Sequence, residues 1–289
     1  MILRVLEEEF HFDTAARVSV SLGHSLGEFA ALVAANHLTY PTALKLVRHR
    51  AEQMSACSLA ARAASLADGG SGEYGMIALV CEPDHLTSLT RTIHAFLGHG
   101  ASEGGKNDSS ANAPPIDQVL VANVNSKNQI VLSGNVERIQ ALLVQIREFG
   151  GHDPRAVRLA TDSPFHSPIM SPAREWMRQE LERTEVRWPG SFPVVSNVSA
   201  RPFGDVAGLK DLLARQCVET VRWWDSIRFL DEGGVRRWVG VGPGKVGRNL
   251  VGKEVGIGGR VKGGGVWGLS GPGEVEGVLR GLEETEGMG

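Results

Sequence analysis

Residues 23–28 read Gly23-His24-Ser25-Leu26-Gly27-Glu28. This stretch follows a β-branched run at 18–22 and precedes an apolar segment at 26–37, so a G-x-S-x-G pattern falls between a predicted strand and a predicted helix. That context is typical of a nucleophile elbow, in which the serine sits on a sharp turn between small neighbours and projects its Oγ. A glycine-rich strand–helix turn without chemistry is the alternative.

The composition fits a soluble globular enzyme. The chain has 289 residues, 42% of them hydrophobic and 22% charged, with a formal net charge of -3. This balance gives no reason to expect nucleic acid or a membrane surface as a partner. Three cysteines lie far apart, without the spacing of a metal site or an even disulfide set, which indicates a reducing compartment and no metal.

The order of apolar segments predicts a small domain inserted into a larger one. Residues 76–160 spell strand, helix, two strands, helix and strand, the order of a ferredoxin-like βαββαβ unit. Its predicted strands lie at 76–81, 119–124, 129–133 and 157–160, and its helices at 83–97 and 136–149. The two strands in the middle are joined by a polar turn at 125–128. We expect an α/β hydrolase-like core from residues 1–75 and 161–289, and a disordered insertion at about 98–115, which is rich in Gly, Ser, Asn and Pro.

The remaining elements belong to the predicted core. The first ten residues show the pattern of an amphipathic helix, and a helix at 41–54 is followed by an Ala-rich break. Residues 233–289 hold 20 of the 36 glycines, so we expect this tail to pack loosely or to be partly disordered. Further elements are expected at 173–183, 194–198, 209–217, 224–231 and 237–241.

Arg50 lies on the predicted helix at 41–54. The spacing predicts a buried stripe of Leu44, Val47, Ala51 and Met54, with Arg50 on its flank. A buried guanidinium is costly without an anionic partner, and a substrate carboxylate bound in a bidentate manner would be one. An arginine that is paired internally, or that extends to solvent, is the alternative.

The segment Ser163-Pro164-Phe165-His166-Ser167-Pro168 contains the best candidate for a general base. Prolines on both sides restrict the backbone around His166, which suits a group that must stay within hydrogen-bonding reach of Ser25. Without further information, an ordinary loop histidine is the favoured interpretation of His166.

The longer string Gly-His-Ser-Leu-Gly-Glu-Phe-Ala-Ala-Leu-Val at 23–33 resembles the malonyl-CoA:acyl-carrier-protein transacylase family, which includes acyltransferase domains of fatty-acid and polyketide synthases. The resemblance spans about 18–250 and recurs at 46–54, 121–134, 163–172, 216–223 and 241–246.

The resemblance implies roles for individual residues. Ser25 matches the nucleophile, Leu26 the residue whose N–H stabilises the oxyanion, Arg50 the arginine that binds the malonyl carboxylate, and His166 the base. The position of Gln216 matches the backbone carbonyl that orients the histidine, so no carboxylic triad member is expected. Other matches are Phe165, whose bulk disfavours an α-methyl group, Asn125, which lines the site or caps a hairpin turn, and His24, a site wall or a packing residue.

The implied reaction transfers malonyl from malonyl-CoA to the phosphopantetheine thiol of acyl carrier protein through a malonyl-serine intermediate, in fatty-acid biosynthesis. It needs no cofactor beyond these substrates, and we expect a monomer. A serine hydrolase or thioesterase of the α/β type, or a catalytically impaired fragment, is the alternative. The low-complexity insertion and the glycine-rich tail resemble fungal-type members of the mitochondrial matrix, with the cytoplasm as the alternative location.

Two features of the sequence depart from simple matches. Family members carry a strand with Gly-Gln-Gly, the second oxyanion donor, well before the nucleophile, and only 24 residues precede Ser25 here. We therefore expect an N-terminally truncated, weakly active or unstable polypeptide. In addition, the segment 242–247, Gly-Pro-Gly-Lys-Val-Gly, satisfies G-x-G-x-x-G, but no clean βαβ unit with an acidic residue on its second strand is predicted, so we interpret it as a structural turn.

Overall fold

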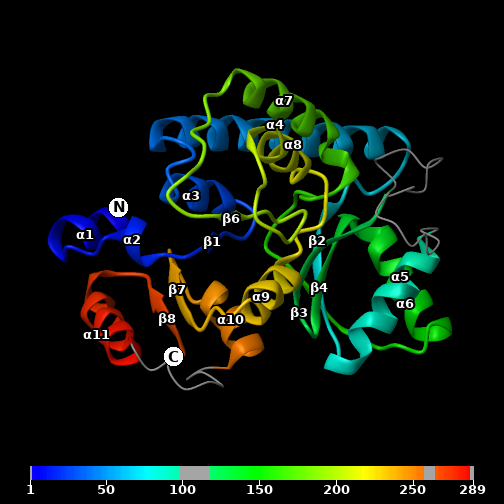
Figure 1. Ribbon diagram of the computed structural model, residues 1–289. Helices are drawn as coiled ribbons and strands as arrows, with labels where there is room; N and C mark the ends of the chain where they lie inside the picture. Colours follow the sequence, from blue (N-terminus) through cyan, green and yellow to red (C-terminus); the bar gives the residue numbers. More distant parts are fainter. Residues whose placement is uncertain (1, 98–117, 257–263, 287–289) are drawn as a thin grey trace.

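The computed structural model describes residues 2–97, 118–256 and 264–286 (Figure 1). The insertion expected at 98–115 lies outside the described residues. A mixed α/β core contains Ser25, and a four-stranded antiparallel sheet lies beside it, which confirms the predicted fold class. No helix in the described part of the chain is both long and apolar enough to cross a membrane.

Two very short parallel strands form the part of the core that holds the elbow. Strand β1 (Ser21–Leu22) pairs with β6 (Val194–Val195), with Leu22 opposite Val195. Both strands are shorter than the segments 18–22 and 194–198 that the sequence predicted. Because the strands are parallel, their carboxyl ends meet at one edge, and the chain leaving each strand enters the same region.

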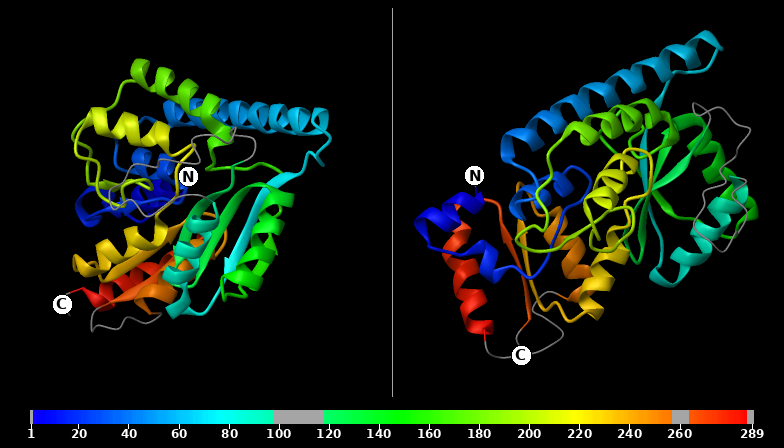
Figure 2. Two further views of the ribbon diagram at one scale, coloured as in Figure 1. Left: turned by 90° about the vertical axis from the view of Figure 1, so that its right-hand side faces the viewer. Right: turned by 45° about the horizontal axis from the view of Figure 1, so that its top comes forward.

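Two helices follow the elbow, and the second is much longer than predicted. After α3 (Gly27–Ala34), α4 extends over Tyr40–Ala67, a length of 28 residues, and Figure 2 shows it crossing the molecule. The hydroxyl of Thr39 caps its N-terminus by accepting from the N–H of Thr42 over 3.3 Å. The break predicted after residue 54 is wrong because the Ala-rich segment, a strong helix former, continues the helix.

The buried stripe of α4 also differs from the prediction. Leu44 and Ala51 are exposed, and the stripe consists of Ala43, Leu46, Arg50, Met54, Cys57, Ala61 and Ser65. These residues recur every three or four positions and so share one helix face. Arg50 therefore lies in the middle of the stripe and not on its flank.

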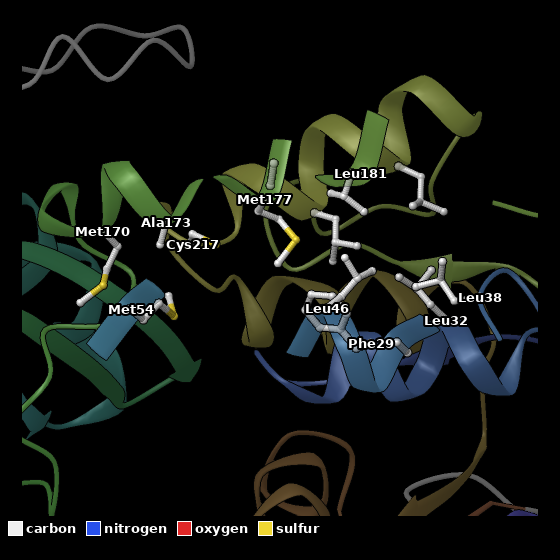
Figure 3. Close-up of a cluster of buried hydrophobic side chains, with 14 of the residues drawn as sticks. Phe29, Leu32, Leu38, Leu46, Met54, Met170, Ala173, Met177, Leu181 and Cys217 are labelled. Carbon is white, nitrogen blue, oxygen red and sulfur yellow. The ribbon is translucent and has the colours of Figure 1, made fainter. Parts of the chain in front are cut away.

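Helices α7 (Ser171–Arg183) and α8 (Val206–Arg215) pack with α3 and α4 around the main apolar cluster. Figure 3 shows Met177 and Leu181 of α7 facing Phe29 and Leu32 of α3. A short 3-10 turn, Pro168–Met170, joins the segment that contains His166 to α7. The base candidate is therefore attached directly to this core.

The four-stranded sheet has the order β3-β4-β2-β5 and is antiparallel throughout. Its helices pack on one face, against residues such as Ile77 and Leu79, and the opposite face presents Met76 and Ala78 toward Phe165. The predicted βαββαβ order is confirmed; the elements are β2 (Tyr74–Val80), a 3-10 turn (Pro83–His85), α5 (Leu86–Phe96), β3 (Leu120–Ser126), β4 (Gln129–Asn135), α6 (Val136–Phe149) and β5 (Arg155–Arg158).

Two backbone hydrogen bonds of Val221 connect this sheet to the core. The N–H of Val221 donates to the carbonyl of Ala122 over 2.8 Å, and the N–H of Val124 donates to the carbonyl of Val221 over 3.0 Å. Val221 thus extends the edge of β3, five residues after Gln216. The two bonds fix the segment that contains Gln216 against the small sheet.

The glycine-rich C-terminal region is more ordered than predicted. After α9 (Trp223–Glu232), it forms β7 (Arg237–Val241), α10 (Val246–Val255), β8 (Gly265–Leu269), a 3-10 turn (Pro272–Glu274) and α11 (Val275–Thr285). The predicted N-terminal helix is present as α1 (Ile2–Glu9), and its Leu6 is buried with Leu269 and Val278. Near the N-terminus, α2 covers Thr14–Arg17. The described part of the tail thus forms regular elements, while residues 257–263 and 287–289, on which part of the expectation falls, lie outside the described residues.

Candidate active site

Ser25 occupies a strained turn directly after β1. Its φ is +50°, in the left-handed region, which costs about 1–3 kcal/mol for a residue other than glycine. A Cβ on Gly23 would lie 2.0 Å from the backbone of Gly27, so this turn requires glycine at 23. A Cβ on Gly27 would meet nothing within 4 Å, so the expected need for a small residue there is not confirmed.

His166 makes a direct contact with the serine. Its Nε2 lies 2.7 Å from Ser25 Oγ, and its Nδ1 lies 2.7 Å from the backbone carbonyl of Gln216. Because a carbonyl only accepts, Nδ1 carries the proton and Nε2 is free to accept the serine hydroxyl. Burial, and then the positive charge of Arg50, lower the pKa of His166 to about 3. The imidazole is thus neutral and oriented as a base.

The side chain of Gln216 connects three further groups of the site. Its Nε2 donates to the carbonyl of Ser25 over 2.9 Å and to the carboxylate of Glu28, and its Oε1 accepts from Arg50 Nη2 over 3.0 Å. The sequence had indicated only the backbone carbonyl of this residue. Gln216 is completely buried, so these contacts hold it in one orientation.

Arg50 lies in the core with hydrogen-bonding capacity to spare. It is 7% exposed, and its Nε is buried without a partner among the described residues. An unpaired buried donor on a charged group is unfavourable, and a carboxylate is the ligand that would satisfy it best. This observation supports the predicted anion site at Arg50.

Glu28 is a buried acid next to the elbow. It is fully buried on the first turn of α3, and burial raises its pKa to about 7 despite the hydrogen bond from Asn197, the contact with Gln216 and the charge of Arg50. It does not contact His166 Nδ1, whose partner is a carbonyl. The expectation that no carboxylate completes a triad agrees with this geometry.

Asn197 is a site residue that sequence reasoning missed. Its Oδ1 accepts from the N–H of Ser25 over 2.7 Å, and its Nδ2 donates to the carbonyl of Gly23 over 2.7 Å. The available signal was the polar pair Ser196-Asn197, which falls in the predicted strand 194–198 and directly follows the observed strand β6. In a parallel sheet, such residues gather at the edge where the chemistry occurs.

The side chains of His24, in the elbow, and of Asn125, on β3, lie next to each other. Their atoms Nε2 and Oδ1 lie 2.9 Å apart, and the His24 ring meets Trp223 edge-on with a centroid distance of 5.3 Å. Burial lowers the pKa of His24, so its ring is held neutral. Asn125 is part of β3, and the tight turn lies at 127–128, so the hairpin-turn interpretation of Asn125 is wrong.

Phe165 and Leu26 complete the predicted set. Phe165 packs against the small sheet beside His166 and is half-buried. Leu26 is the N-cap residue of α3 and is 53% exposed. Within the described residues its backbone N–H has no protein acceptor, so it is available to an oxyanion next to Ser25. No group of three side chains that could hold a metal occurs in the described parts of the chain.

The glycine motif at 242–247 lies away from this cluster, between β7 and α10. Strands β7 and β8 are parallel with α10 between them, so the motif opens a βαβ unit. The second strand, Gly265–Leu269, carries no acidic residue, and the dinucleotide pattern is therefore incomplete.

The chain is similar in sequence and in fold to known proteins. No protein-family model matches the chain. The malonyl CoA-acyl carrier protein transacylase of Bacillus subtilis is 33% identical over 232 residues, which cover 80% of this chain and 63% of that protein. The enzyme of the same name from Haemophilus influenzae is 29% identical and is covered to 70%. The chain thus spans less than two thirds of the B. subtilis relative.

Solved structures give the same result. An acyl-carrier-protein S-malonyltransferase from Bartonella henselae superimposes with a TM-score of 0.75 and 26% identity, over 98% of this chain and 77% of that one. A malonyl-transacylase solved in complex with its type II polyketide acyl-carrier protein gives a TM-score of 0.72 and 25% identity, over 98% of this chain and 76% of that one. In sequence and in fold, the chain is therefore similar to malonyl-CoA:acyl-carrier-protein transacylases.

Proposed function

We propose that this protein transfers malonyl groups from malonyl-CoA to the phosphopantetheine thiol of an acyl carrier protein, as the names of its relatives state for them. The observation that carries the proposal is the buried Arg50, whose Nε lacks a partner in the described structure, in the same hydrogen-bonded cluster as the Ser25–His166 pair. A neutral acyl group would leave that donor unpaired, and a malonyl carboxylate would pair it.

The first half-reaction forms a malonyl-serine ester. Ser25 Oγ attacks the thioester carbonyl carbon while His166 Nε2 accepts the hydroxyl proton. The carbonyl oxygen becomes an oxyanion next to the N–H of Leu26, at the positive end of α3. When the tetrahedral intermediate collapses, the carbon–sulfur bond breaks, and the CoA thiolate takes the proton from His166 and leaves.

The second half-reaction reverses the roles. The phosphopantetheine thiol gives its proton to His166, and its sulfur attacks the ester carbonyl of malonyl-Ser25. The ester bond to Oγ breaks, and Oγ takes the proton back from His166. The backbone carbonyl of Gln216 keeps the histidine in the required tautomer throughout. The complex between a related transacylase and its carrier protein supports a carrier protein as the second substrate.

Mass spectrometry of the intact protein after mixing with malonyl-CoA tests this function. We expect one malonyl adduct on Ser25, discharged by a phosphopantetheinylated carrier protein, and no adduct in Ser25→Ala. Ser21→Ala is the matched control, because Ser21 has a buried hydroxyl without a partner in the described structure. Rapid release of free malonate in the absence of carrier protein would instead indicate a hydrolase.

Three finer points are proposals as well. The chain divides into residues 1–75 with 161–289, and 76–160, which limited proteolysis would test. It acts as a monomer, which size-exclusion chromatography with light scattering would test. Its location in the mitochondrial matrix rests on the low-complexity insertion and the glycine-rich tail alone; the relatives named above are bacterial and lend it no support. Imaging of the tagged natural protein would distinguish this location from the cytoplasm.

A further inference from the structure

Asn197 is buried at the edge where β1 and β6 end, and it does not contact Ser25 Oγ. It is 2% exposed, and it follows β6 by two residues as Ser25 follows β1 by three. Its side chain reaches the turn from the opposite strand and forms hydrogen bonds on both sides of His24. The two bonds therefore bracket the residue before the nucleophile.

Every polar atom of Asn197 is used. Besides the bonds to Ser25 and Gly23, its backbone N–H donates to Glu28 Oε1 over 2.9 Å, and its carbonyl accepts from the N–H of Arg222 over 2.8 Å. Glu28 lies in the first turn of α3, the helix that follows the elbow. The asparagine is thus held by its backbone while its amide group holds the turn.

The chemistry of these bonds requires an asparagine. The Ser25 N–H needs an acceptor and the Gly23 carbonyl needs a donor, and one terminal amide supplies both. A flipped amide would place donor against donor and acceptor against acceptor. An ionised aspartate supplies two acceptors, and an alanine supplies neither group.

We propose that Asn197 is a positioning residue that keeps Ser25 in its left-handed conformation, with Glu28 anchoring it to the start of α3. Without the two amide bonds, the turn relaxes toward an ordinary backbone conformation and Ser25 Oγ moves away from His166. Displacements of about 1 Å at a reacting group cost about 100-fold in rate. The link to malonyl transfer rests on the proposed function, but the positioning role does not.

A serine-directed fluorophosphonate, which needs no malonyl-CoA, measures the reactivity of Ser25 directly. We expect Asn197→Ala to lower the labelling rate about 100-fold while the protein stays folded by circular dichroism. Asn135→Ala is the matched control: Asn135 is 7% exposed and its Oδ1 caps α6 by accepting from Arg138 N–H over 3.1 Å. It should lower the melting temperature and leave labelling unchanged. Wild-type labelling by Asn197→Ala would overturn the proposal.

Asn197→Asp gives a second test, the pH dependence of the labelling rate, which a purely structural role of Asn197 would not change. A protonated aspartic acid can accept from the Ser25 N–H and donate its O–H to the Gly23 carbonyl, whereas the aspartate cannot donate. Burial favours the protonated form, so the ratio of Asp-variant to wild-type labelling should rise at least about tenfold from about pH 8 to about pH 5. Taking the ratio cancels the titration of the neighbouring charged and titratable groups, which are Glu28 on α3, Arg50 on α4, His24 in the turn, His166 before α7 and Arg222 before α9.

A ratio that does not change with pH in a folded Asn197→Asp protein would overturn the need for both bonds. The same samples are mixed with malonyl-CoA, and the mass of the intact protein is measured by mass spectrometry. If wild-type protein reacts with the fluorophosphonate but forms no malonyl adduct, the proposed function fails while the labelling series still decides the role of Asn197.

Discussion

Arg50 and Gln216 are joined by a buried hydrogen bond of 3.0 Å, from Nη2 of the guanidinium to Oε1 of the amide. The backbone carbonyl of the same Gln216 accepts from His166 Nδ1. The group proposed to bind the acyl carboxylate and the group proposed to take the serine proton are therefore both bound to one residue. Substitutions at either end should reveal separable contributions to selectivity and to proton transfer.

Arg50→Ala should lower kcat/KM for malonyl-CoA by about 100-fold or more, because it removes charge-assisted hydrogen bonds worth about 1.5–3 kcal/mol each. Acylation by acetyl-CoA should not fall, because acetyl has no carboxylate. Competition between the two thioesters measures the change. Arg48→Ala, on the exposed face of α4 where Arg48 pairs with Glu52, is the control and should behave like wild type. An equal loss for both thioesters would contradict the assignment.

The rate of Ser25 acylation should stay nearly constant from about pH 8 down to about pH 5. A histidine with an ordinary pKa near 6.5 would lose its base form over this range, whereas His166, with a pKa of about 3, stays neutral. Rapid-quench measurement of malonyl-enzyme formation gives the profile. We expect Glu28→Gln to give the same profile, and a limb with a midpoint near 6.5 in either protein would show that His166 titrates normally.

The same two buried groups should act in opposite directions on stability. The pKa of His166 is depressed from 6.5, so its contribution is lost as the pH falls from about 6.5 toward about 3. The pKa of Glu28 is raised from 4.5 to about 7, so the folded state binds the extra proton and loses stability as the pH rises through that window.

Glu28→Gln should therefore gain stability relative to wild type as the pH rises, by about 3 kcal/mol between about pH 4.5 and pH 7. His166→Gln should show the reverse, losing its advantage over wild type as the pH rises toward 6.5. Urea unfolding at a series of pH values measures both differences. Parallel stability curves for the three proteins would mean that neither group is perturbed by burial.

Phe165→Ala should increase the use of methylmalonyl-CoA relative to malonyl-CoA by about tenfold, because pockets discriminate one methyl group by about 10- to 200-fold. Phe192→Ala is a useful control, since Phe192 is 6% exposed in the main apolar cluster and its loss creates a cavity there. It should lower stability and leave the ratio of the two substrates unchanged.

Much of the architecture could be predicted from local patterns. The helix Val136–Phe149 and the strand Arg237–Val241 have the predicted bounds, because each has a clear period and clear end signals. The predicted helix containing Arg50 ends too early, at residue 54, because the following Ala- and Ser-rich segment has few large apolar residues. Its buried positions, such as Cys57 and Ala61, are small because α4 packs closely there.

The candidate site was predictable where a motif carries the chemistry, as at Ser25 and His166. Asn197 and the side chain of Gln216 were not, because their partners are 172 and 191 residues away along the chain. Such contacts depend on the pairing of two strands of only two residues each, and strands that short leave almost no periodic pattern in a sequence.

The parallel pairing of Leu22 with Val195 has a consequence for how this protein tolerates change. Ser25 and Asn197 lie at fixed numbers of residues beyond that pair, three after Leu22 and two after Val195. Inserting or deleting a single residue in either short stretch would move Ser25 or Asn197 out of reach of the other, although neither residue would be substituted. Between the paired residues Leu22 and Val195 and the two residues Ser25 and Asn197, we therefore expect a change in the number of residues to be tolerated less well than most substitutions nearby.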